Sequence, residues 1–541
     1  MTTTTKTLKG TGIVPQTTIG TLYVYKKAQT SVVRYPIVDS AAEVARFEAA
    51  KQTAIAELKE LYNKAMEEVG VNEAMIFEVH QMMIEDEDYN EDIRATIAKK
   101  SANAEFAVDQ AKKTFANIFE AMDDQYMRGR GADVRDISDR IINVLRGSVT
   151  SLNFEKPVIL VAEELTPSET LQMDKEKVLA FVTTGGSKSS HTAILARMLG
   201  IPAIVQIDEQ IEHYHGSTAA VDGEAGIVYL NPNAQDVEEL EKKAKEQKER
   251  AKRLQELKGK ENITTSGQKI EIFANIGEAA DVKMVLESDA GGIGLFRSEF
   301  LYLQSDYYPT EEEQFAVYKL VLQKMRDKKV IIRTMDIGAD KKIEYFNLPE
   351  EENPALGLRA IRISLTRVDI FKTQLRALYR ASAYGKLSIM FPMIISVEEV
   401  TEIKEIIEEV KAALREEKIL FNENVEIGIM IETPAAVMIS DLLAKEVDFF
   451  SVGTNDLTSY TLAVDRQNQT LTKFDNPHHL AIKRMLKIVA DNAHEAGIWI
   501  GVCGELAADT TMSEYFLSIG IDELSVSPPY VLPLREKIRT L

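Results

Sequence analysis

The sequence predicts a multidomain α/β protein that ends in a (β/α)8 barrel, also called a TIM barrel. From Glu271 onward, eight short apolar runs alternate with helical segments over about 270 residues, which is the pattern and length of that barrel. Before it, residues 40–147 are rich in Ala, Glu, Lys and Leu at helical spacing, with few helix breakers. A third segment, 157–230, shows strand and turn signals. We therefore expect three kinds of architecture in one chain.

Composition excludes several classes of protein. The 541-residue chain has a formal net charge of −21, which argues against nonspecific binding to nucleic acid or anionic membranes. It contains no apolar run of about twenty residues and no leader-like start, so we expect no membrane insertion. Its single cysteine, Cys503, excludes an internal disulfide and fits a cytoplasmic protein. An anionic substrate would have to be held by arginines gathered locally.

The first 262 residues predict one β/α unit with a helical insertion. A turn region that contains Gly10 and Gly12 comes first, and short strands are expected after it at 23–25 and 31–34. The helical block follows, and residues 157–230 then supply the remaining strands of the same unit. Residues 234–262 are highly charged with a narrow apolar stripe, which indicates a solvated linker helix.

His191 follows a Gly/Ser-rich turn, residues 185–190, that connects an apolar strand to an apolar helix. Backbone N–H groups at a helix N-terminus attract anions, and glycine lets a phosphate approach the backbone closely. A largely neutral imidazole is also a competent nucleophile. The turn therefore suits a phosphorylated histidine, although a histidine that only caps or packs explains these residues alone equally well.

Polar residues recur where the predicted barrel strands end, which is where barrels of this kind place their active sites. They are Asn275, Arg297, Arg333, Asp336, Glu432, Asn455, Asp456, Cys503 and Glu505, with Arg359, Arg362 and Arg466 just beyond strands. The arginines form the cationic cluster that an anionic substrate needs. Glu432 and Asp456 end separate strands, and two carboxylates completed by substrate oxygens and water suit Mg²⁺.

Eight motifs in this order resemble Enzyme I, the phosphoenolpyruvate–protein phosphotransferases of the bacterial sugar phosphotransferase system. The motifs are GGSKSSHTAILAR, GGIGLFRSEFLY, RTMDIGADK, NPALGLRAIR, IMFPMI, MIETPAAV, GTNDLTSY and CGELAAD. The resemblance runs from about Leu8 to Leu534. It implies transfer of a phosphoryl group from phosphoenolpyruvate (PEP) to a histidine of the small phosphocarrier protein HPr.

The resemblance also implies a division into domains. A swivelling phosphohistidine domain would comprise 1–35 and 148–230, a helical HPr-binding subdomain 36–147, a linker helix 231–262, and a PEP-binding barrel that forms the homodimer 263–541.

Site residues follow by match to the family motifs. His191 would carry the phosphoryl group, Thr170 would support it, and Cys503 would protonate the enolate of pyruvate. Glu432 and Asp456 would bind Mg²⁺. The substrate-binding residues would be Arg297, Arg333, Asn455, Arg466, Arg359 and Lys341, and those near HPr would be His80, Met82, Met83, Glu85, Asp86 and Arg130. Without the resemblance, Cys503 reads as a small buried strand residue, and the two methionines read as core packing.

The chain departs from the family pattern at a few positions. Ser187 and Lys188 replace a glycine and an arginine before the histidine, Gln206 replaces a glycine after GIPAIV, and Ala508 replaces another in CGELAAD. The family continues past Leu541, which predicts a less stable barrel or an altered dimer. Two alternative functions remain: a weakly active paralogue that binds or regulates a phosphocarrier, and a relative of pyruvate phosphate dikinase or PEP synthase, for which an ATP-binding domain is missing.

Overall fold

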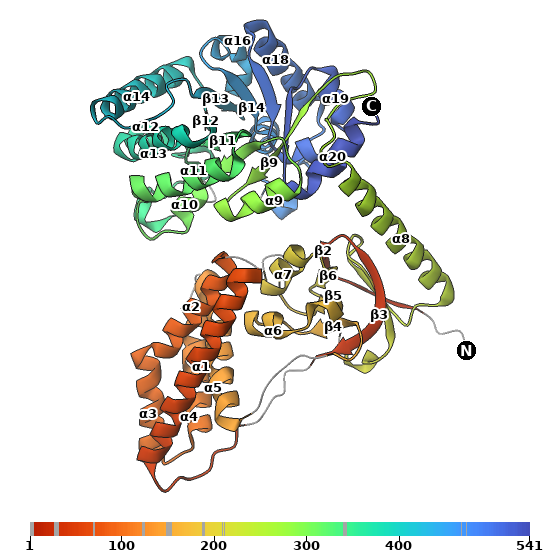
Figure 1. Cartoon of the computed structure of the whole chain (residues 1–541), viewed down its shortest axis with the longest axis vertical. Helices are drawn as coiled ribbons and strands as arrows, with labels where there is room; N and C mark the ends of the chain where they lie inside the picture. The colour runs from red at the N-terminus through yellow and green to blue at the C-terminus, as the bar shows by residue number, and fades with distance from the viewer. Residues whose placement is uncertain are drawn as a thin grey trace. The chain divides into compact units, whose positions relative to one another are not determined.

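The computed structural model describes most of the chain, in two compact units, Met1–Ala251 and Lys252–Leu541 (Figure 1). The described residues are 5–25, 32–68, 71–121, 125–147, 154–186, 190–207, 209, 211–338, 343–466, 468–471 and 473–541. Each unit has hydrophobic cores of its own, so each is described by itself.

A bundle of helices fills the segment 40–146 and confirms the predicted helical block (Figure 1). Its helices are α1 (Ser40–Glu68), α2 (Val71–Glu85), α3 (Glu87–Lys100), α4 (Ala104–Glu120) and α5 (Gln125–Arg146). Asp39 starts α1 by accepting the backbone N–H groups of Ala41 and Ala42 at 2.9 and 3.0 Å. Apolar residues at helical spacing, such as Ala54, Leu58 and Leu61 of α1, are buried between the helices.

An eight-stranded sheet forms the rest of the first unit, in the order β1-β8-β7-β3-β4-β5-β6-β2. Its strands are β1 (Lys6–Lys9), β2 (Thr11–Val14), β3 (Thr17–Val24), β4 (Val158–Ala162), β5 (Val178–Thr183), β6 (Ala203–Val205), β7 (Thr218–Asp222) and β8 (Ile227–Leu230). The strands β1 and β2 form the two edges of this sheet, although only Gly10 separates them in the sequence. The sheet must therefore curve so that its two edges come together near Gly10. Helices α6 (Pro167–Gln172) and α7 (His191–Leu199) belong to the same unit.

Two details of the first unit differ from the sequence prediction. Residues 32–34, the described part of the strand predicted at 31–34, have no regular secondary structure. The side chain of Val33 is 68% exposed, so it does not pack against an apolar core as a strand residue would. The second difference is the linker helix α8 (Ala234–Glu256), which is not fully solvated. Leu240 is buried, and Lys243 pairs with Asp222 of β7 at 2.8 Å, so this part of the helix packs on the sheet.

The second unit is a closed barrel of parallel strands, as predicted. The strands are β9 (Glu271–Ile276), β10 (Ile293–Arg297), β11 (Lys329–Arg333), β12 (Lys386–Phe391), β13 (Glu426–Ile431), β14 (Phe449–Val452), β15 (Trp499–Val502) and β16 (Glu523–Val526). The helices around them are α9 (Val282–Glu287), α10 (Glu299–Leu303), α11 (Glu311–Met325), α12 (Ile361–Thr366), α13 (Val368–Ala381), α14 (Val397–Glu416), α15 (Pro434–Met438), α16 (Ser440–Leu443), α17 (Thr454–Leu462), α18 (Leu480–Ala496), α19 (Ser513–Ser518) and α20 (Val531–Ile538).

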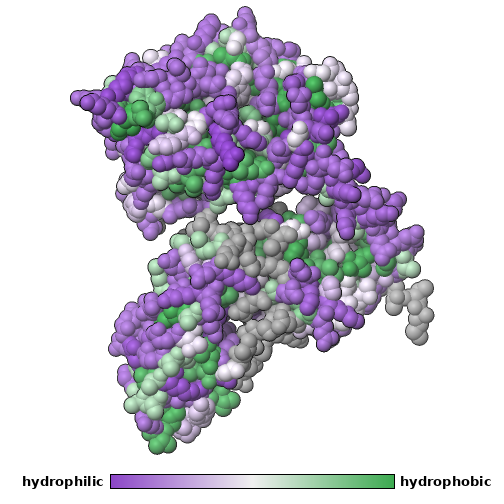
Figure 2. Space-filling model, viewed as in Figure 1, coloured by the Kyte–Doolittle hydropathy of each residue, from purple (hydrophilic) through white to green (hydrophobic). Residues whose placement is uncertain are grey.

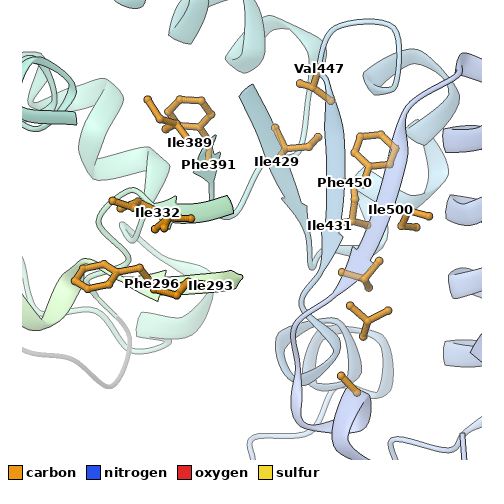
Figure 3. Packing of buried hydrophobic residues seen from close by; sticks show 14 of the residues in the cluster. Ile293, Phe296, Ile332, Ile389, Phe391, Ile429, Ile431, Val447, Phe450 and Ile500 are labelled. Carbon is orange, nitrogen blue, oxygen red and sulfur yellow. The ribbon is translucent and has the colours of Figure 1, made fainter. Parts of the chain in front are cut away.

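Both faces of the barrel strands are apolar, because one face meets the helices and the other fills the interior. Ile332, Ile389 and Phe450 belong to the large cluster shared with the helices, part of which Figure 3 shows. Their neighbours Ile331 and Phe449 belong to a separate inner cluster that also contains Cys503. This alternation explains why the strands read as continuous apolar runs in the sequence.

The face of the molecule shown in Figure 2 is mostly hydrophilic, with apolar side chains in scattered groups. Across the described part of the chain, no helix combines the length and the apolar character needed to span a membrane.

Glu523, the first residue of β16, is a buried carboxyl inside the barrel and gives a prediction about stability. Burial, aided by the charge of Glu271, raises the pKa of Glu523 from 4.5 to about 8. The folded protein therefore binds this proton more tightly than the unfolded chain does, and the barrel loses stability as pH rises from 4.5 through about 8. Glutamine cannot ionise, so the Glu523→Gln variant should keep its stability as pH rises. At pH 9 we expect its free energy of unfolding to exceed that of wild type by roughly 2–4 kcal/mol.

Trp499 allows a direct measurement, because it is the one tryptophan of the chain and lies in β15, next to β16. Guanidinium unfolding of the full chain, followed by its fluorescence, would give the barrel's stability from pH 5 to 9. Parallel stability curves for wild type and Glu523→Gln would contradict the prediction.

Candidate active site

Arg297 and Arg333 are the last residues of neighbouring strands, β10 and β11, and they pair in the sheet register. Glu432 directly follows β13, Asp456 lies in the first turn of α17 after β14, and Cys503 directly follows β15. Because all these strands are parallel, their carboxyl ends meet at one mouth of the barrel. The polar residues that the sequence placed at strand ends are therefore brought to the same end of the barrel.

The guanidinium of Arg333 is held inside the mouth by two acids. It contacts Glu299 at 2.6 Å and Asp336 at 3.1 Å, and all three side chains are buried. Burial lowers the pKa of Arg333, but the charges of Glu299 and Asp336 outweigh it, so the net pKa shift is upward. Arg333 is a fixed cation with a preset orientation.

Arg297 differs from Arg333 because it makes no ion pair with any residue that the structure describes. Part of its side chain is exposed at the mouth, while desolvation of the guanidinium and then the like charge of Arg333 lower its pKa. A cation in this position gains from an anion that approaches both arginines.

Arg359 and Arg466 approach the carboxylate side of the site. Arg359 is buried and contacts Asp336 at 3.0 Å, Asp456 at 3.6 Å and the hydroxyl of Tyr460 at 3.1 Å. Arg466 is exposed and lies 3.9 Å from Asp456. Asp456 thus lies between two cations.

Glu432 is fully enclosed at the centre of the site. Its Oε1 accepts the backbone N–H of Met393 at 2.7 Å. A Cβ added at Gly453 would lie only 2.9 Å from Oε2, so a glycine at this position leaves room for the carboxylate. Burial raises the pKa of Glu432, and the nearby carboxylates Asp456 and Asp336 raise it further. Arg333 and Arg359 act in the opposite direction, so this carboxyl lies between acids that disfavour its charge and arginines that favour it.

In the described part of the chain, no group of three or more His, Cys, Asp or Glu side chains is arranged to hold a metal ion. Glu432 and Asp456 would thus supply only two protein ligands. Such a set fits Mg²⁺, which usually keeps several waters and binds through one or two carboxylates together with substrate phosphate. The residues present therefore fit the predicted metal, although they do not form a complete protein cage.

Cys503 lies in the inner cluster of the barrel, 4% exposed. Its Sγ lies 3.6 Å from the carbonyl oxygen of Val452, as a weak donor. Burial raises the pKa of the thiol to about 12, so the group keeps its proton at neutral pH. A protonated thiol at the mouth of the barrel can donate that proton.

Asn455 is fixed by a reciprocal contact with Glu505. Its side-chain Oδ1 accepts the backbone N–H of Glu505 at 3.0 Å, and its Nδ2 lies 3.4 Å from a Glu505 carboxylate oxygen. The remaining substrate residue predicted from the sequence, Lys341, lies outside the described residues.

The predicted phosphohistidine, His191, is the first residue of α7 in the other unit. Ser190 caps this helix by accepting the backbone N–H of Ala193 at 3.4 Å, and Gly186 in the preceding turn has a φ of 82°. Thr170, its predicted support, is buried on α6, which contacts α7. The imidazole of His191 and the substituted residues Ser187 and Lys188 lie outside the described part of the chain.

Gln206 occupies a position where the resemblance to the family predicts glycine. Its φ is 60°, in the left-handed region that glycine adopts readily. The glutamine therefore occupies a position where the backbone itself favours glycine.

The predicted HPr-facing residues separate into two groups. Met82 is 63% exposed, Glu85 and Asp86 are exposed, and Met83 is partly buried. His80, in contrast, has no exposed surface and lies between α2 and α5. Direct contact of its side chain with a partner is therefore wrong for this conformation, because the imidazole points into the bundle while Met82, two residues later, points out.

Arg130 belongs to neither group, since its guanidinium is partly buried and pairs with Asp133 at 3.0 Å.

Sequence reasoning missed Glu299 and Tyr460, which hold Arg333 and Arg359. Glu299 lies two residues after Arg297 in the run RSEF, so an acid that close to a strand-end arginine was an available signal. Tyr460 lies in α17, one helical turn after Asp456, which places both side chains on one face.

The barrel segment 251–541 matches the PEP-binding domain of PEP-utilising enzymes. Residues 9–130 match the N-terminal domain of these enzymes, and residues 154–226 match their mobile domain. The first of these matches alone covers more than half of the chain.

Full-length relatives agree with the domain matches. The chain is 42% identical over 541 residues to the phosphoenolpyruvate-protein phosphotransferase of Priestia megaterium, which covers 99% of this chain and 94% of the relative. It is 42% identical over 538 residues to that of Bacillus subtilis strain 168, with the same coverage. It is 44% identical over 503 residues to that of Haemophilus influenzae, covering 92% of this chain and 88% of the relative. The chain therefore belongs to the phosphoenolpyruvate–protein phosphotransferase family of PEP-utilising enzymes.

Proposed function

We propose that this protein transfers the phosphoryl group of PEP to His191 and from there to a histidine of the phosphocarrier HPr, the first step of sugar uptake by the phosphotransferase system. The observation that carries the proposal is the barrel mouth, where Arg297, which has no ion pair among the described residues, converges with a fixed Arg333 and the acids Glu432 and Asp456. A substrate that is both a phosphate and a carboxylate, accompanied by a cation, matches this set of charges.

Arginine supplies most of the binding in this proposal. Arg297 and Arg333 hold the phosphate of PEP, because the planar guanidinium donates two parallel hydrogen bonds to an oxyanion. The Nε groups of Arg333 and Arg359 are buried donors with no hydrogen-bond partner in the described part of the chain, so each has an N–H to offer. Arg466 and Asn455 hold the carboxylate end of PEP.

In the chemical step, the P–O bond of PEP breaks and a P–N bond to His191 forms, which leaves the enolate of pyruvate. The transferring phosphoryl group carries its negative charge on three oxygens, so fixed positive charge lowers the barrier. Mg²⁺ bound by Glu432 and Asp456 would neutralise phosphate charge when present. Transfer to HPr then breaks the P–N bond of His191 and forms another on the carrier's histidine.

Cys503 completes the reaction by protonating the enolate at carbon. The raised pKa of its thiol ensures that the proton is available. Replacing Cys503 with alanine should leave binding of PEP nearly unchanged and slow the formation of pyruvate by about 10²–10⁴-fold. Stopped-flow assay of pyruvate release measures this, with Ser388→Ala, a buried strand change near the opposite end of the barrel, as the matched control. A Cys503→Ala variant with full turnover would assign the proton to another donor.

We propose further that the helical block docks HPr through the exposed residues of α2 and the following turn. Met82 offers an apolar contact, and Glu85 and Asp86 offer negative charge to a basic partner. The phosphohistidine domain would swivel between the barrel and the carrier. The barrel would form a homodimer. Sedimentation with and without PEP and Mg²⁺ tests the dimer.

One labelling experiment tests the function. The full chain is incubated with radiolabelled PEP and Mg²⁺, with and without HPr, and the stability of the bound label is measured. Label that is acid-labile and base-stable, and that passes to HPr, supports the proposal. Absence of label would contradict it in favour of a binding or regulatory protein, and a requirement for ATP would point instead to dikinase chemistry.

A further inference from the structure

His80 is a fully buried imidazole whose two nitrogens both face carboxylates of α5. Nε2 lies 3.2 Å from Asp133 Oδ1, and Nδ1 lies 3.6 Å from Asp136 Oδ2. The ring of α2 therefore lies between two carboxylates of α5, within reach of both. Buried carboxylates are costly when a polar neighbour is removed, so the imidazole supports the positions of both acids.

Asp133 connects this ring to the side of the block expected to meet the carrier. Its other oxygen, Oδ2, pairs with Arg130 at 3.0 Å. Burial raises the pKa of Asp133, but the hydrogen bonds and charges of His80 and Arg130 outweigh burial, so the pKa is lowered overall. Asp133 is therefore held from both sides, by a buried imidazole and by a guanidinium nearer the surface.

Asp136 connects the same ring to the phosphohistidine domain. Its Oδ2, the oxygen that faces His80, also accepts the hydroxyl of Ser168 at 2.8 Å. Ser168 is buried on α6, the short helix that also carries Thr170. A capping box between Thr166 and Glu169 starts this helix, and Glu169 accepts the hydroxyl of Tyr25 at 2.8 Å. Beyond these contacts α6 lies against α1 and α7, so the Ser168–Asp136 hydrogen bond is a polar link between α6 and the bundle.

We propose that His80 is a positioning residue: by holding Asp133 and Asp136 inside the bundle, it fixes α6, and with it Thr170, for phosphoryl transfer at His191. Successive helical residues are about 100° apart, so Ser168 and Thr170 face different sides of α6. The helix can thus be anchored to the bundle by one residue and support the phosphohistidine by the other. This inference rests on the proposed function for its catalytic consequence, but the link itself is a property of the free protein.

The link is tested in the free protein by hydrogen exchange of the backbone amides of α6. The variants are His80→Gln and Ser168→Ala, with His213→Gln, an exposed histidine of the same unit, as the matched control. A lost hydrogen bond or ion pair of this kind should speed α6 exchange about threefold to tenfold in both variants. The control and the barrel helices should exchange as in wild type. Unchanged α6 exchange in both variants overturns the proposal.

The catalytic consequence is tested by steady-state transfer from PEP to HPr. For both variants we expect kcat to fall about threefold to tenfold while KM for HPr stays within about twofold, since the exposed docking residues are untouched. The double variant should be no slower than the slower single variant, because both changes break one path. A raised KM with unchanged kcat would mean that His80 acts through the docking face and would overturn the proposal.

If His80→Gln fails to fold, the Ser168→Ala variant still tests the proposal, because that substitution removes only a hydroxyl group. A wild-type protein that takes no phosphoryl group from PEP would refute the proposed function, and α6 exchange would still decide the positioning role.

Discussion

No phosphoenzyme is expected to form from PEP when His191 is replaced with alanine. The proposal routes every phosphoryl group through a nitrogen of this side chain, and alanine has no nucleophile to replace it. We expect label bound to the variant to fall at least about a thousandfold, to background, because removal of a covalent nucleophile leaves only the slow direct reaction. Acid lability and base stability of the label measure the phosphohistidine.

The barrel should remain intact in this variant, since His191 lies in the first unit and begins a helix that Ser190 caps. PEP should therefore still bind, which calorimetry can show with the same protein preparation. His213→Ala, which removes an exposed imidazole from the same unit, should be labelled as wild type is. Persistent label in His191→Ala would place the phosphoryl group on another residue and remove the central element of the proposal.

A second large effect is expected for Glu432→Gln. The amide keeps the size of the side chain and can still accept the N–H of Met393, but it loses the charge that a cation requires. We expect affinity for Mg²⁺ to fall at least about a hundredfold, because even residues that only support metal ligands cost 10–100-fold when changed. PEP-dependent labelling should fall by a similar factor at limiting Mg²⁺. Titration with Mn²⁺, followed by paramagnetic resonance, measures cation binding without turnover.

Glu426→Gln is the matched control, because Glu426 begins the strand that Glu432 follows. Its carboxylate accepts Lys329 at 2.7 Å and Ser388 at 2.8 Å, at the opposite end of the barrel. Cation binding should be unchanged in this variant. Equal loss in both variants would indicate damage to β13 in place of a metal site.

The sequence predicted the barrel and its mouth well because parallel strands buried on both faces read as apolar runs. In such a strand the first polar residue marks the end, which identified Arg297, Arg333 and Glu432 directly. The same reasoning found Cys503, although only the structure shows the burial that keeps its thiol protonated. Periodicity also predicted the helical block.

Contacts between distant residues were less accessible. The pairing of Arg333 with Glu299 depends on how a short helix packs after β10, and spacing alone does not encode that. The match of the segment VHQMMIEDEDY to the family predicts His80 near HPr together with Met82, but a two-residue step reverses the face of a helix, and His80 is buried where Met82 is exposed. Of the strand predicted at 31–34, the described residues 32–34 are irregular, because β-branched residues raise strand propensity even where no described strand lies beside them to pair.

The acids that hold Arg333 and Arg359 make anion and cation binding interdependent. An anion that arrives alone must compete with Glu299 and Asp336 for these guanidinium groups. Under the proposed function, a cation held by Glu432 and Asp456 would draw negative charge away from Arg359, which would then be freer to attract the anion. By thermodynamic reciprocity, PEP must then tighten Mg²⁺ by the same factor by which Mg²⁺ tightens PEP.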